Sequence, residues 1–281
     1  GRPIAARLED KISSEAKEFE AKYGIKPSLH SLVIGRDEVA SMFAEITLRK
    51  LKELNMHGEV HRLPENVAEA EVVSLLKDLS SRDDVHGIII NEPIPKGLDK
   101  NLIYSSIAPE KDVDGQNPYN LGMLMLGVED HAPLTPHAVV RILEEYNVPL
   151  SGKRACIINR TSVVGKPLAM MLLSRDATVT VCHTKTVNLE EITRSSDIIV
   201  VAVGKPLFLK EHMVSKNSIV VDVGTNRLNG KTVGDADFDR LVDKVAAITP
   251  VPGGVGAVKT LLMLERTLKN AQALLSKRKS A

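Results

Sequence analysis

Short apolar runs alternate with segments of helical periodicity along the chain, and this alternation restricts the possible folds more than any other feature. A short apolar run bounded by turn signals is typical of a buried strand, and apolar residues three or four positions apart are typical of an amphipathic helix. Strands that alternate with helices form a mainly parallel sheet covered by helices on both faces. In the first part of the chain we expect helices near residues 4–19, 39–56 and 67–79 and strands at 29–34, 59–63 and 87–91.

The same alternation starts again at residue 154, after a segment that contains Pro133, Pro136 and Gly152. This second series predicts strands at 155–158, 178–182, 197–203 and 218–223 and helices at 138–146 and 165–173. A chain of 281 residues fits about two domains. We therefore expect an α/β protein with one domain at residues 1–125, a doubly wound domain at 126–258, and a last helix at 259–281 that packs back on the first domain.

Charge and composition exclude several classes of partner. Lys and Arg number 37 against 36 Asp and Glu, a net charge of +1, and aromatic residues make up only 3% of the chain. Nucleic-acid binding is not expected, because the chain has neither a basic excess nor a set of stacking side chains. No membrane span is expected either, because the longest strongly apolar stretch, 198–203, is too short to cross a bilayer. Cys156 and Cys182 lie in expected strands, which favours reduced thiols and a cytoplasmic protein, although a targeting segment ahead of Gly1 stays open.

A polar turn follows the expected strand 155–158 and leads directly into the helix at 165–173. A strand, a tight turn and a helix N-terminus together offer backbone N–H groups and the positive end of the helix dipole to a pyrophosphate. This turn has a single glycine, so an ordinary strand-to-helix connection stays open as an alternative. The candidate cofactor-binding residues of the turn are Asn159, Arg160, Thr161, Val164 and Gly165.

The end of the next expected strand bears on the choice of cofactor. An NAD site usually has an Asp or Glu at this point for the ribose hydroxyls. This chain instead has the segment Cys182-His183-Thr184-Lys185-Thr186. Hydroxyl and basic groups, together with Arg160, suit the 2′-phosphate of NADP through charge-assisted hydrogen bonds. We therefore expect His183 and Thr184 to bind NADP in preference to NAD, with a plain surface loop as the alternative.

Other polar or glycine-rich turns also follow expected strands, where open α/β sheets bind ligands. They lie at residues 91–95, 111–115, 203–206, 222–226 and 249–256. Val203, Gly204 and Thr225 are the cofactor candidates among them. The glycines at 253, 254 and 256 permit a close approach of the backbone to a ligand, whereas Asp-x-Asp-Gly at 112–115 is by itself typical of a turn.

Two histidines have the spacing of metal ligands. Gly58 lies between His57 and His61, however, and breaks the helical face that they would have to share. No third ligand is evident in the sequence around them. We therefore expect no metal site.

Taken together and in this order, these segments resemble the methylenetetrahydrofolate dehydrogenase/cyclohydrolase family. The resemblance runs from about residue 29 to the carboxyl terminus, and the segments at 111–115 and 252–256 are its most specific parts. It implies two α/β domains, the second of them Rossmann-like, with the substrate cleft between them, and a homodimer. It also implies oxidation of 5,10-methylenetetrahydrofolate to the 5,10-methenyl cation with NADP or NAD and, in most members, hydrolysis of that cation to 10-formyltetrahydrofolate.

The resemblance also implies roles for individual residues. Asp114 would hold the pterin ring, and the loop formed by Pro252, Gly253 and Gly254 would border the folate and the nicotinamide. Around the cofactor phosphates and the adenosine ribose it implies Arg160, Thr161, His183 and Thr184.

The chain departs from the family where the hydrolytic chemistry resides. The family helix after the first strand carries Tyr-x-x-x-Lys, and Phe43 and Thr47 occupy those two positions here. Asn91 stands where the family has Gln at a strand end. The candidate catalytic positions are thus Asp114, Asn91 and Thr47, and Phe43 is a further candidate for substrate binding.

These replacements affect the two reactions unequally. Hydride transfer from a methylene flanked by two nitrogens needs no general base, because the nitrogen lone pairs stabilise the cation. Hydrolysis of the methenyl cation needs proton movement, for which a lysine is suited and the Thr47 hydroxyl is not. We therefore predict an NADP-preferring dehydrogenase with weak or absent cyclohydrolase activity.

Two alternatives stay open. Lys50 lies on the same helix face as Phe43 and could replace the missing lysine, which would keep both activities. A catalytically silent paralogue that binds folate or nucleotide is the other alternative. It is disfavoured because Asp114, the phosphate turn and the glycine loop are all retained.

Overall fold

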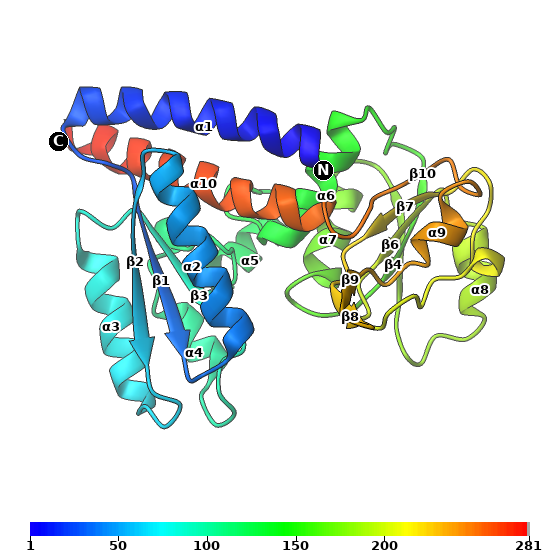
Figure 1. Cartoon of the computed structure of the whole chain (residues 1–281), viewed down its shortest axis with the longest axis horizontal. Coiled ribbons are helices and arrows are strands. Elements are labelled where there is room, and N and C mark those ends of the chain that lie inside the picture. The colour runs from blue at the N-terminus through cyan, green and yellow to red at the C-terminus, as the bar shows by residue number, and fades with distance from the viewer. Residues whose placement is uncertain (280–281) are drawn as a thin grey trace. The chain divides into compact units, whose positions relative to one another are not determined.

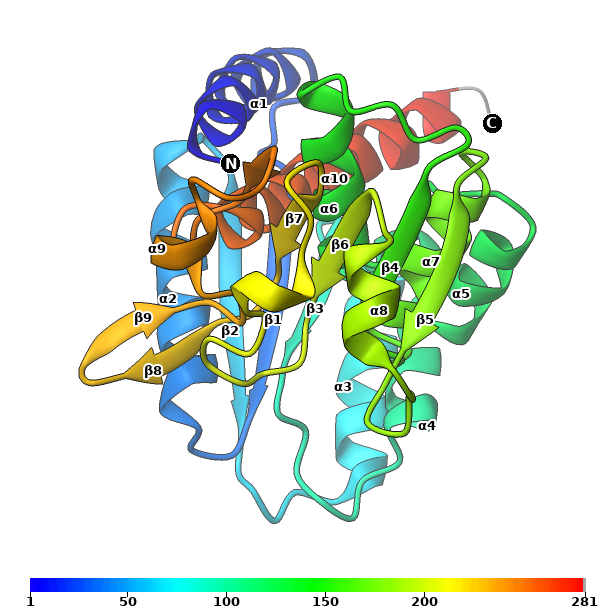
Figure 2. The same ribbon diagram turned by 90° about the vertical axis from the view of Figure 1, so that its right-hand side faces the viewer.

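The computed structural model describes residues 1–279, so the last two residues of the expected helix 259–281 lie outside the described residues. The chain divides into two compact units (Figures 1 and 2). The three-stranded unit contains Ala6–Met123 and the chain from Thr260 onward. The five-stranded unit contains Gly1–Ala5 and Leu124–Lys259, so the first five residues group with the second half of the sequence.

The three-stranded unit is built on a parallel sheet in the order β2-β1-β3. Its strands are β1 (Ser28–Ile34), β2 (His57–Leu63) and β3 (Gly87–Asn91). The central strand β1 is buried along its whole length, as its nearly continuous apolar sequence requires.

Alternate residues of β1 face two different helical layers. Leu32 and Ile34 join a core with α3 (Glu69–Ser81) and α4 (Lys100–Ser105). Val33 instead packs against α2 (Glu38–Glu53) on the opposite face of the sheet (Figure 1). Because side chains alternate along a strand, His30 lies on the face of Leu32 and Ser31 lies on the face covered by α2.

Two long helices complete this unit, α1 (Arg2–Tyr23) and α10 (Val255–Lys279). The apolar stripe that predicts α1 is buried, and Lys11 of α1 donates to Glu265 Oε1 of α10 at 2.8 Å. Gly24 follows α1 with φ of 73°, a left-handed conformation that ends the helix.

The five-stranded unit has a parallel sheet in the order β10-β7-β6-β4-β5 (Figure 2). The chain passes from β4 to one side for β5 and then crosses to the other side for β6, which is the doubly wound arrangement. The expected α/β class is therefore confirmed. The strands are β4 (Arg154–Ile158), β5 (Thr178–Cys182), β6 (Ile198–Val201), β7 (Ile219–Asp222) and β10 (Ala247–Ile248). The helices wholly inside this unit are α6 (Leu134–Glu145), α7 (Gly165–Leu173), α8 (Leu189–Arg194) and α9 (Phe238–Leu241).

Several short elements escaped the sequence analysis. The antiparallel hairpin of β8 (Asn226–Leu228) and β9 (Lys231–Val233) turns at Asn229 and Gly230, which both have positive φ. An Asn-Gly pair is a strong hairpin signal that could have predicted it. The short elements α4, α5 (Pro118–Met125), α8, η1 (Pro109–Lys111) and η2 (Glu211–Met213) are too brief to show a clear helical period.

Candidate functional site

The turn between β4 and α7 is organised by the side chain of Asn159. Its Oδ1 accepts hydrogen bonds from the backbone N–H groups of Thr161 (2.8 Å) and Gly165 (2.9 Å). Its Nδ2 donates to the carbonyl of Ala202, just beyond β6, at 2.7 Å. A Cβ atom at Gly165 would collide with the Asn159 carbonyl, so only glycine allows α7 to begin this close to the end of β4.

The first turn of α7 lacks some of the open backbone donors that the sequence predicts there. Thr161 accepts the N–H of Val164 with its hydroxyl (3.2 Å) and the N–H of Lys166 with its carbonyl (3.0 Å). Asn159 already holds the N–H of Gly165. The expectation of free donors is therefore wrong for residues 164–166, because Asn159 and Thr161 of the turn already accept these N–H groups.

A cavity of about 450 Å³ lies at the carboxyl ends of β4, β5 and β6, a size ordinary for a small-molecule site. The cofactor candidates that line it are Asn159, Arg160, His183, Thr184 and Val203. The candidates outside its lining are Thr161, Val164, Gly165, Gly204 and Thr225. The lining also includes Thr186, Lys205 and Phe208, which the sequence analysis did not select.

The charged side chains that line this cavity are cationic. Arg160 and Lys205 line it, and its lining within the described part of the chain includes no Asp or Glu. His183 Nδ1 accepts the N–H of Lys185 at 3.1 Å, which leaves Nε2 as the nitrogen that carries the proton in a neutral ring. The group that would hold a 2′-phosphate is therefore present, and the acid that would hold ribose hydroxyls is not. Lys205 could have been found from the sequence, since it directly follows two selected residues.

Two buried carboxylates that the sequence analysis did not select fix the neighbouring loops. Asp235 is fully buried and accepts the backbone N–H groups of residues 203–205. Asp222, at the end of β7, accepts the N–H groups of residues 224, 235 and 236 at 2.7–3.0 Å. Burial raises the pKa of Asp222 to about 6, although these three donors favour its ionised form. The loop with Val203 and Gly204 thus takes its shape from a residue some 30 positions away.

The segment 111–115 in the three-stranded unit contains two aspartates with different surroundings. Asp112 is buried and accepts the N–H groups of Gly115 (3.0 Å) and Asn117 (2.8 Å), which builds the turn that Asp-x-Asp-Gly predicts. Asp114 is only partly buried. Burial, followed by the charge of Asp114, raises the pKa of Tyr104.

Thr47 and Asn91 are buried polar residues of the same unit. Thr47 is 1% exposed, on the buried face of α2. Asn91, 5% exposed at the end of β3, donates through Nδ2 to Ser31 Oγ (2.6 Å) and to the Leu32 carbonyl (3.1 Å). Among the described residues, neither Thr47 Oγ1 nor Asn91 Oδ1 has a hydrogen-bond partner. Phe43, one turn before Thr47, is partly exposed. Buried polar groups without a hydrogen-bond partner are uncommon in folded proteins.

Lys50 is held by two carboxylates. Its Nζ lies 2.7 Å from Glu53 Oε2 and 2.8 Å from Glu9 Oε1 of α1. The hydrogen bonds to Glu53 and then Glu9 raise the pKa of Lys50. A lysine that moves protons near neutral pH needs a lowered pKa. The geometry therefore gives no support to Lys50 as a relocated base.

The remaining substrate candidates lie in the five-stranded unit. Pro252, Gly253 and Gly254 follow β10, and the peptide bond between Val251 and Pro252 is cis. Gly253 has φ of 102°, a conformation that other residues rarely adopt. Each unit thus holds its own share of the predicted substrate-binding residues.

A doubly wound parallel sheet with a cationic cavity at its strand ends defines a dinucleotide-binding α/β protein. Two family models match this chain: the catalytic domain of tetrahydrofolate dehydrogenase/cyclohydrolase over residues 1–114 and its NAD(P)-binding domain over residues 133–275. The chain belongs to the tetrahydrofolate dehydrogenase/cyclohydrolase family.

Individual relatives extend over nearly the whole chain. A protein of Campylobacter concisus named "Bifunctional protein FolD" is 40% identical over 278 residues, which are 99% of this chain and 98% of the relative. The crystal structure of the bifunctional enzyme FolD from Campylobacter jejuni has a TM-score of 0.94 at 39% identity and 97% coverage of both chains. The Trypanosoma brucei enzyme, solved with NADP cofactor and an inhibitor, has a TM-score of 0.92 at 31% identity and covers 97% of this chain and 96% of its own.

These matches confirm the family, the enzyme class and the NAD(P)-binding character that the sequence predicts. None of the helices formed by residues 1–279 has the length and apolar character needed to cross a bilayer.

Proposed function

We propose that this enzyme oxidises 5,10-methylenetetrahydrofolate to the 5,10-methenyl cation with NADP, and that its cyclohydrolase activity is weak or absent. The dehydrogenase part agrees with the family and with relatives named for both reactions. The second part is specific to this chain, and one observation carries it. The position where the family has a lysine is a buried threonine without a hydrogen-bond partner among the described residues, and the nearest alternative, Lys50, is bound to two carboxylates.

The residues present support hydride transfer without a general base. NADP, when bound, supplies the acceptor for the hydride. Asp114 would accept hydrogen bonds from the amide and amino groups of the pterin, and Pro252, Gly253 and Gly254 would border the folate beside the nicotinamide. Alignment of donor and acceptor is the main requirement of such a reaction, and these residues align rather than exchange protons.

Hydrolysis makes a different demand on the site. Water must be activated and a proton must move, which a positioned group of suitable pKa accelerates by about 10²–10⁴-fold. A threonine hydroxyl at residue 47 does not ionise near neutral pH, and Asn91 has no titratable group. The methenyl cation should therefore leave the enzyme largely unhydrolysed.

The cavity in the five-stranded unit supports NADP as the preferred cofactor. Arg160 and Lys205 line it. The absence of a side chain at Gly165 lets the N-terminus of α7 lie close to the end of β4. Charge-assisted hydrogen bonds to a 2′-phosphate fit this set of side chains better than bonds to ribose hydroxyls do. His183 and Thr184 would complete the phosphate and ribose contacts.

The experiment follows both products separately. Purified enzyme receives methylenetetrahydrofolate with NADP or with NAD, and the absorbances of methenyl product and reduced cofactor are recorded. We expect methenyl product to accumulate with NADP, and added methenyltetrahydrofolate to disappear at little more than the spontaneous rate. No cofactor reduction with either nucleotide would favour the silent paralogue, and equal use of NAD would contradict the cofactor preference.

Thr47→Lys and Lys50→Met separate the two explanations of hydrolysis. Thr47→Lys should raise the hydrolysis rate in part, because Phe43 lacks a phenol and Asn91 is shorter than Gln. Lys50→Met should leave hydrolysis unchanged. A large enzyme-dependent hydrolysis that vanishes in Lys50→Met would overturn the proposal and establish the bifunctional alternative, which the names of the relatives favour.

Two further properties are part of this proposal. The enzyme is expected to be a homodimer, which light scattering of the purified protein tests, and to be cytoplasmic, which cell fractionation tests.

A further inference from the structure

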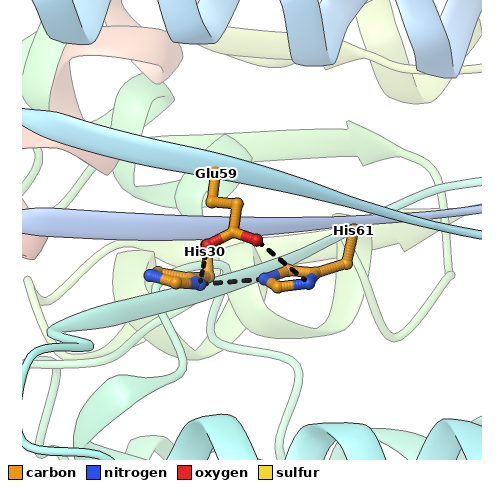
Figure 3. A group of neighbouring side chains, drawn as sticks. All are labelled: His30, Glu59 and His61. Atoms are coloured by element: carbon orange, nitrogen blue, oxygen red, sulfur yellow. Dashed lines mark hydrogen bonds and ion pairs between the residues drawn. The ribbon is translucent and has the colours of Figure 1, made fainter.

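Three potential metal ligands meet on one face of the three-stranded sheet (Figure 3). His30 lies on β1, and Glu59 and His61 lie two residues apart on β2. The parallel register pairs His30 with Glu59 and Leu32 with His61. Because residues two apart on a strand share a face, this register places all three side chains on the same side of the sheet.

The distances suit a shared ion. His30 Nδ1 lies 2.9 Å from His61 Nε2, and Glu59 Oε2 lies 3.9 Å from His30 Nδ1. Two ligand atoms that each lie about 2.1 Å from one tetrahedral ion are about 3.4 Å apart. The two imidazole nitrogens are within about 0.5 Å of this separation. The Glu59 side chain is 52% exposed, so its carboxylate can move the remaining distance of about 0.5 Å toward His30 Nδ1.

His30 is the buried ligand of the group and is 1% exposed. A neutral imidazole offers a nitrogen lone pair to a metal ion, whereas a protonated one does not. The other charged groups that act on His30 are Arg82 and Asp84, and the Asp84 carboxylate is engaged by the Arg82 guanidinium at 2.7 Å.

We propose that His30, Glu59 and His61 form a binding site for a divalent transition-metal ion, with Zn²⁺ as the ion that best fits the donor set. Two imidazole nitrogens and one carboxylate oxygen are a recurrent set for zinc, and water completes the coordination on the exposed side of the group. Mg²⁺ and Ca²⁺ prefer an all-oxygen shell and do not fit. The expectation of no metal site considered the pair His57 and His61 and found no third ligand, whereas the group contains His61 without His57. The residues that complete it are Glu59 and a histidine 31 positions before His61.

The site lies on the face of the central strand opposite to the contact between Ser31 and Asn91. His30 lies on the face of β1 that α3 covers, whereas Ser31, the partner of Asn91, lies on the face that α2 covers. An ion held here would connect the edge strand β2 to the central strand β1. Its expected role is to stabilise this edge of the sheet without contact to the reacting groups.

The test uses the full chain without a histidine tag, stripped of metal with a chelator. Titration calorimetry with Zn²⁺ and the visible absorption of added Co²⁺ measure the binding, and thermal unfolding with and without Zn²⁺ measures its effect on stability. We expect one ion per chain, a rise in Tm of several degrees with excess Zn²⁺, and no response to Mg²⁺ or Ca²⁺.

Variants locate the site. His61→Gln and His30→Gln should weaken Zn²⁺ binding at least 100-fold and abolish the rise in Tm, and Glu59→Gln should weaken binding about tenfold. His57→Gln is the matched control, because His57 is an exposed histidine on the same strand, and its binding should equal that of the wild type. His61 and Glu59 are not fully buried, so their variants test the site even if His30→Gln fails to fold.

Failure to bind Zn²⁺, or binding that persists in His61→Gln and Glu59→Gln, would overturn the proposal and leave a simple hydrogen bond between the two histidines. Dehydrogenase turnover in His61→Gln serves as the fold control. Because zinc binding is measured without folate or nucleotide, its outcome is independent of the proposed enzymatic function.

Discussion

The two units satisfy their buried polar side chains to different degrees. In the five-stranded unit the buried Asp222 and Asp235 and the partly buried Asn159 each accept two or more N–H groups, and these bonds set the shape of the loops around the cavity. In the three-stranded unit Thr47 Oγ1 and Asn91 Oδ1 are buried, and neither has a partner among the described residues.

The cofactor cavity of the five-stranded unit thus has ordered loops, whereas the candidate substrate residues of the three-stranded unit include buried acceptors that lack a partner among the described residues. An unsatisfied buried acceptor costs about 1–3 kcal/mol, so a chain keeps it where a ligand completes the bond or where a former role has been lost. The loops of the five-stranded unit are already fixed by hydrogen bonds within the unit, so they are ordered before a cofactor binds. The open acceptors of the three-stranded unit, Thr47 Oγ1 and Asn91 Oδ1, belong to two of the positions at which we propose a change in the hydrolytic chemistry.

The largest effect is expected from Asp114→Ala, which tests the candidate substrate site of the three-stranded unit. Loss of the hydrogen bonds to the pterin should reduce dehydrogenase turnover by at least about 100-fold, since each bond to a charged group contributes about 1.5–3 kcal/mol. The affinity for NADP, measured by calorimetry, should not change, because Asp114 belongs to the other unit. Near-normal turnover would reduce Asp114 to a turn residue.

Asp235→Ala tests the hydrogen-bonded loops of the five-stranded unit. The backbone N–H groups of residues 203–205 would lose their common acceptor, which should lower the free energy of unfolding by about 2–3 kcal/mol and weaken NADP binding. Urea denaturation and a binding titration measure the two effects. Asp235→Asn, which keeps one acceptor oxygen, should be intermediate. Wild-type stability in Asp235→Ala would mean that the loop keeps its shape without this carboxylate.

Arg160→Ala sharpens the cofactor part of the comparison. The variant should weaken NADP binding by about 1.5–3 kcal/mol and leave NAD binding nearly unchanged, because only NADP carries the 2′-phosphate. Lys166→Ala is the matched control, since this exposed lysine lies outside the cavity lining. Equal losses for NAD and NADP would show that Arg160 does not contact the 2′-phosphate.

The smallest effect is expected from a pair of threonine variants, one in each unit. Thr47→Val removes a buried hydroxyl without a partner among the described residues and should stabilise the free enzyme by up to about 1 kcal/mol. Thr193→Val removes a buried hydroxyl that donates to the Glu190 carbonyl at 3.1 Å and should destabilise it by about 1 kcal/mol. Thermal unfolding of both variants measures the contrast. A loss of stability in Thr47→Val would mean that its hydroxyl is satisfied in solution.

The local features of this protein follow directly from its amino-acid sequence. Apolar periodicity placed the main strands and helices within a few residues of their observed bounds, because the side chains that define each pattern are close in the chain. The order of the turns predicted the family, which the comparisons confirm. The replacement at residue 47 was equally visible, because the residue at a known motif position is a property of the sequence alone.

The contacts between polar groups that are distant in the chain depend on how its elements pack in three dimensions. Asp235 reaches the loop at 203–205 from about 30 residues away, and Glu9 reaches Lys50 from 41 residues away. His30 meets His61 only because β1 and β2 pair in one particular register, and a shift of one residue would turn their side chains to opposite faces. Such pairings depend on register and helix packing, which follow from burial of the whole core rather than from any local pattern.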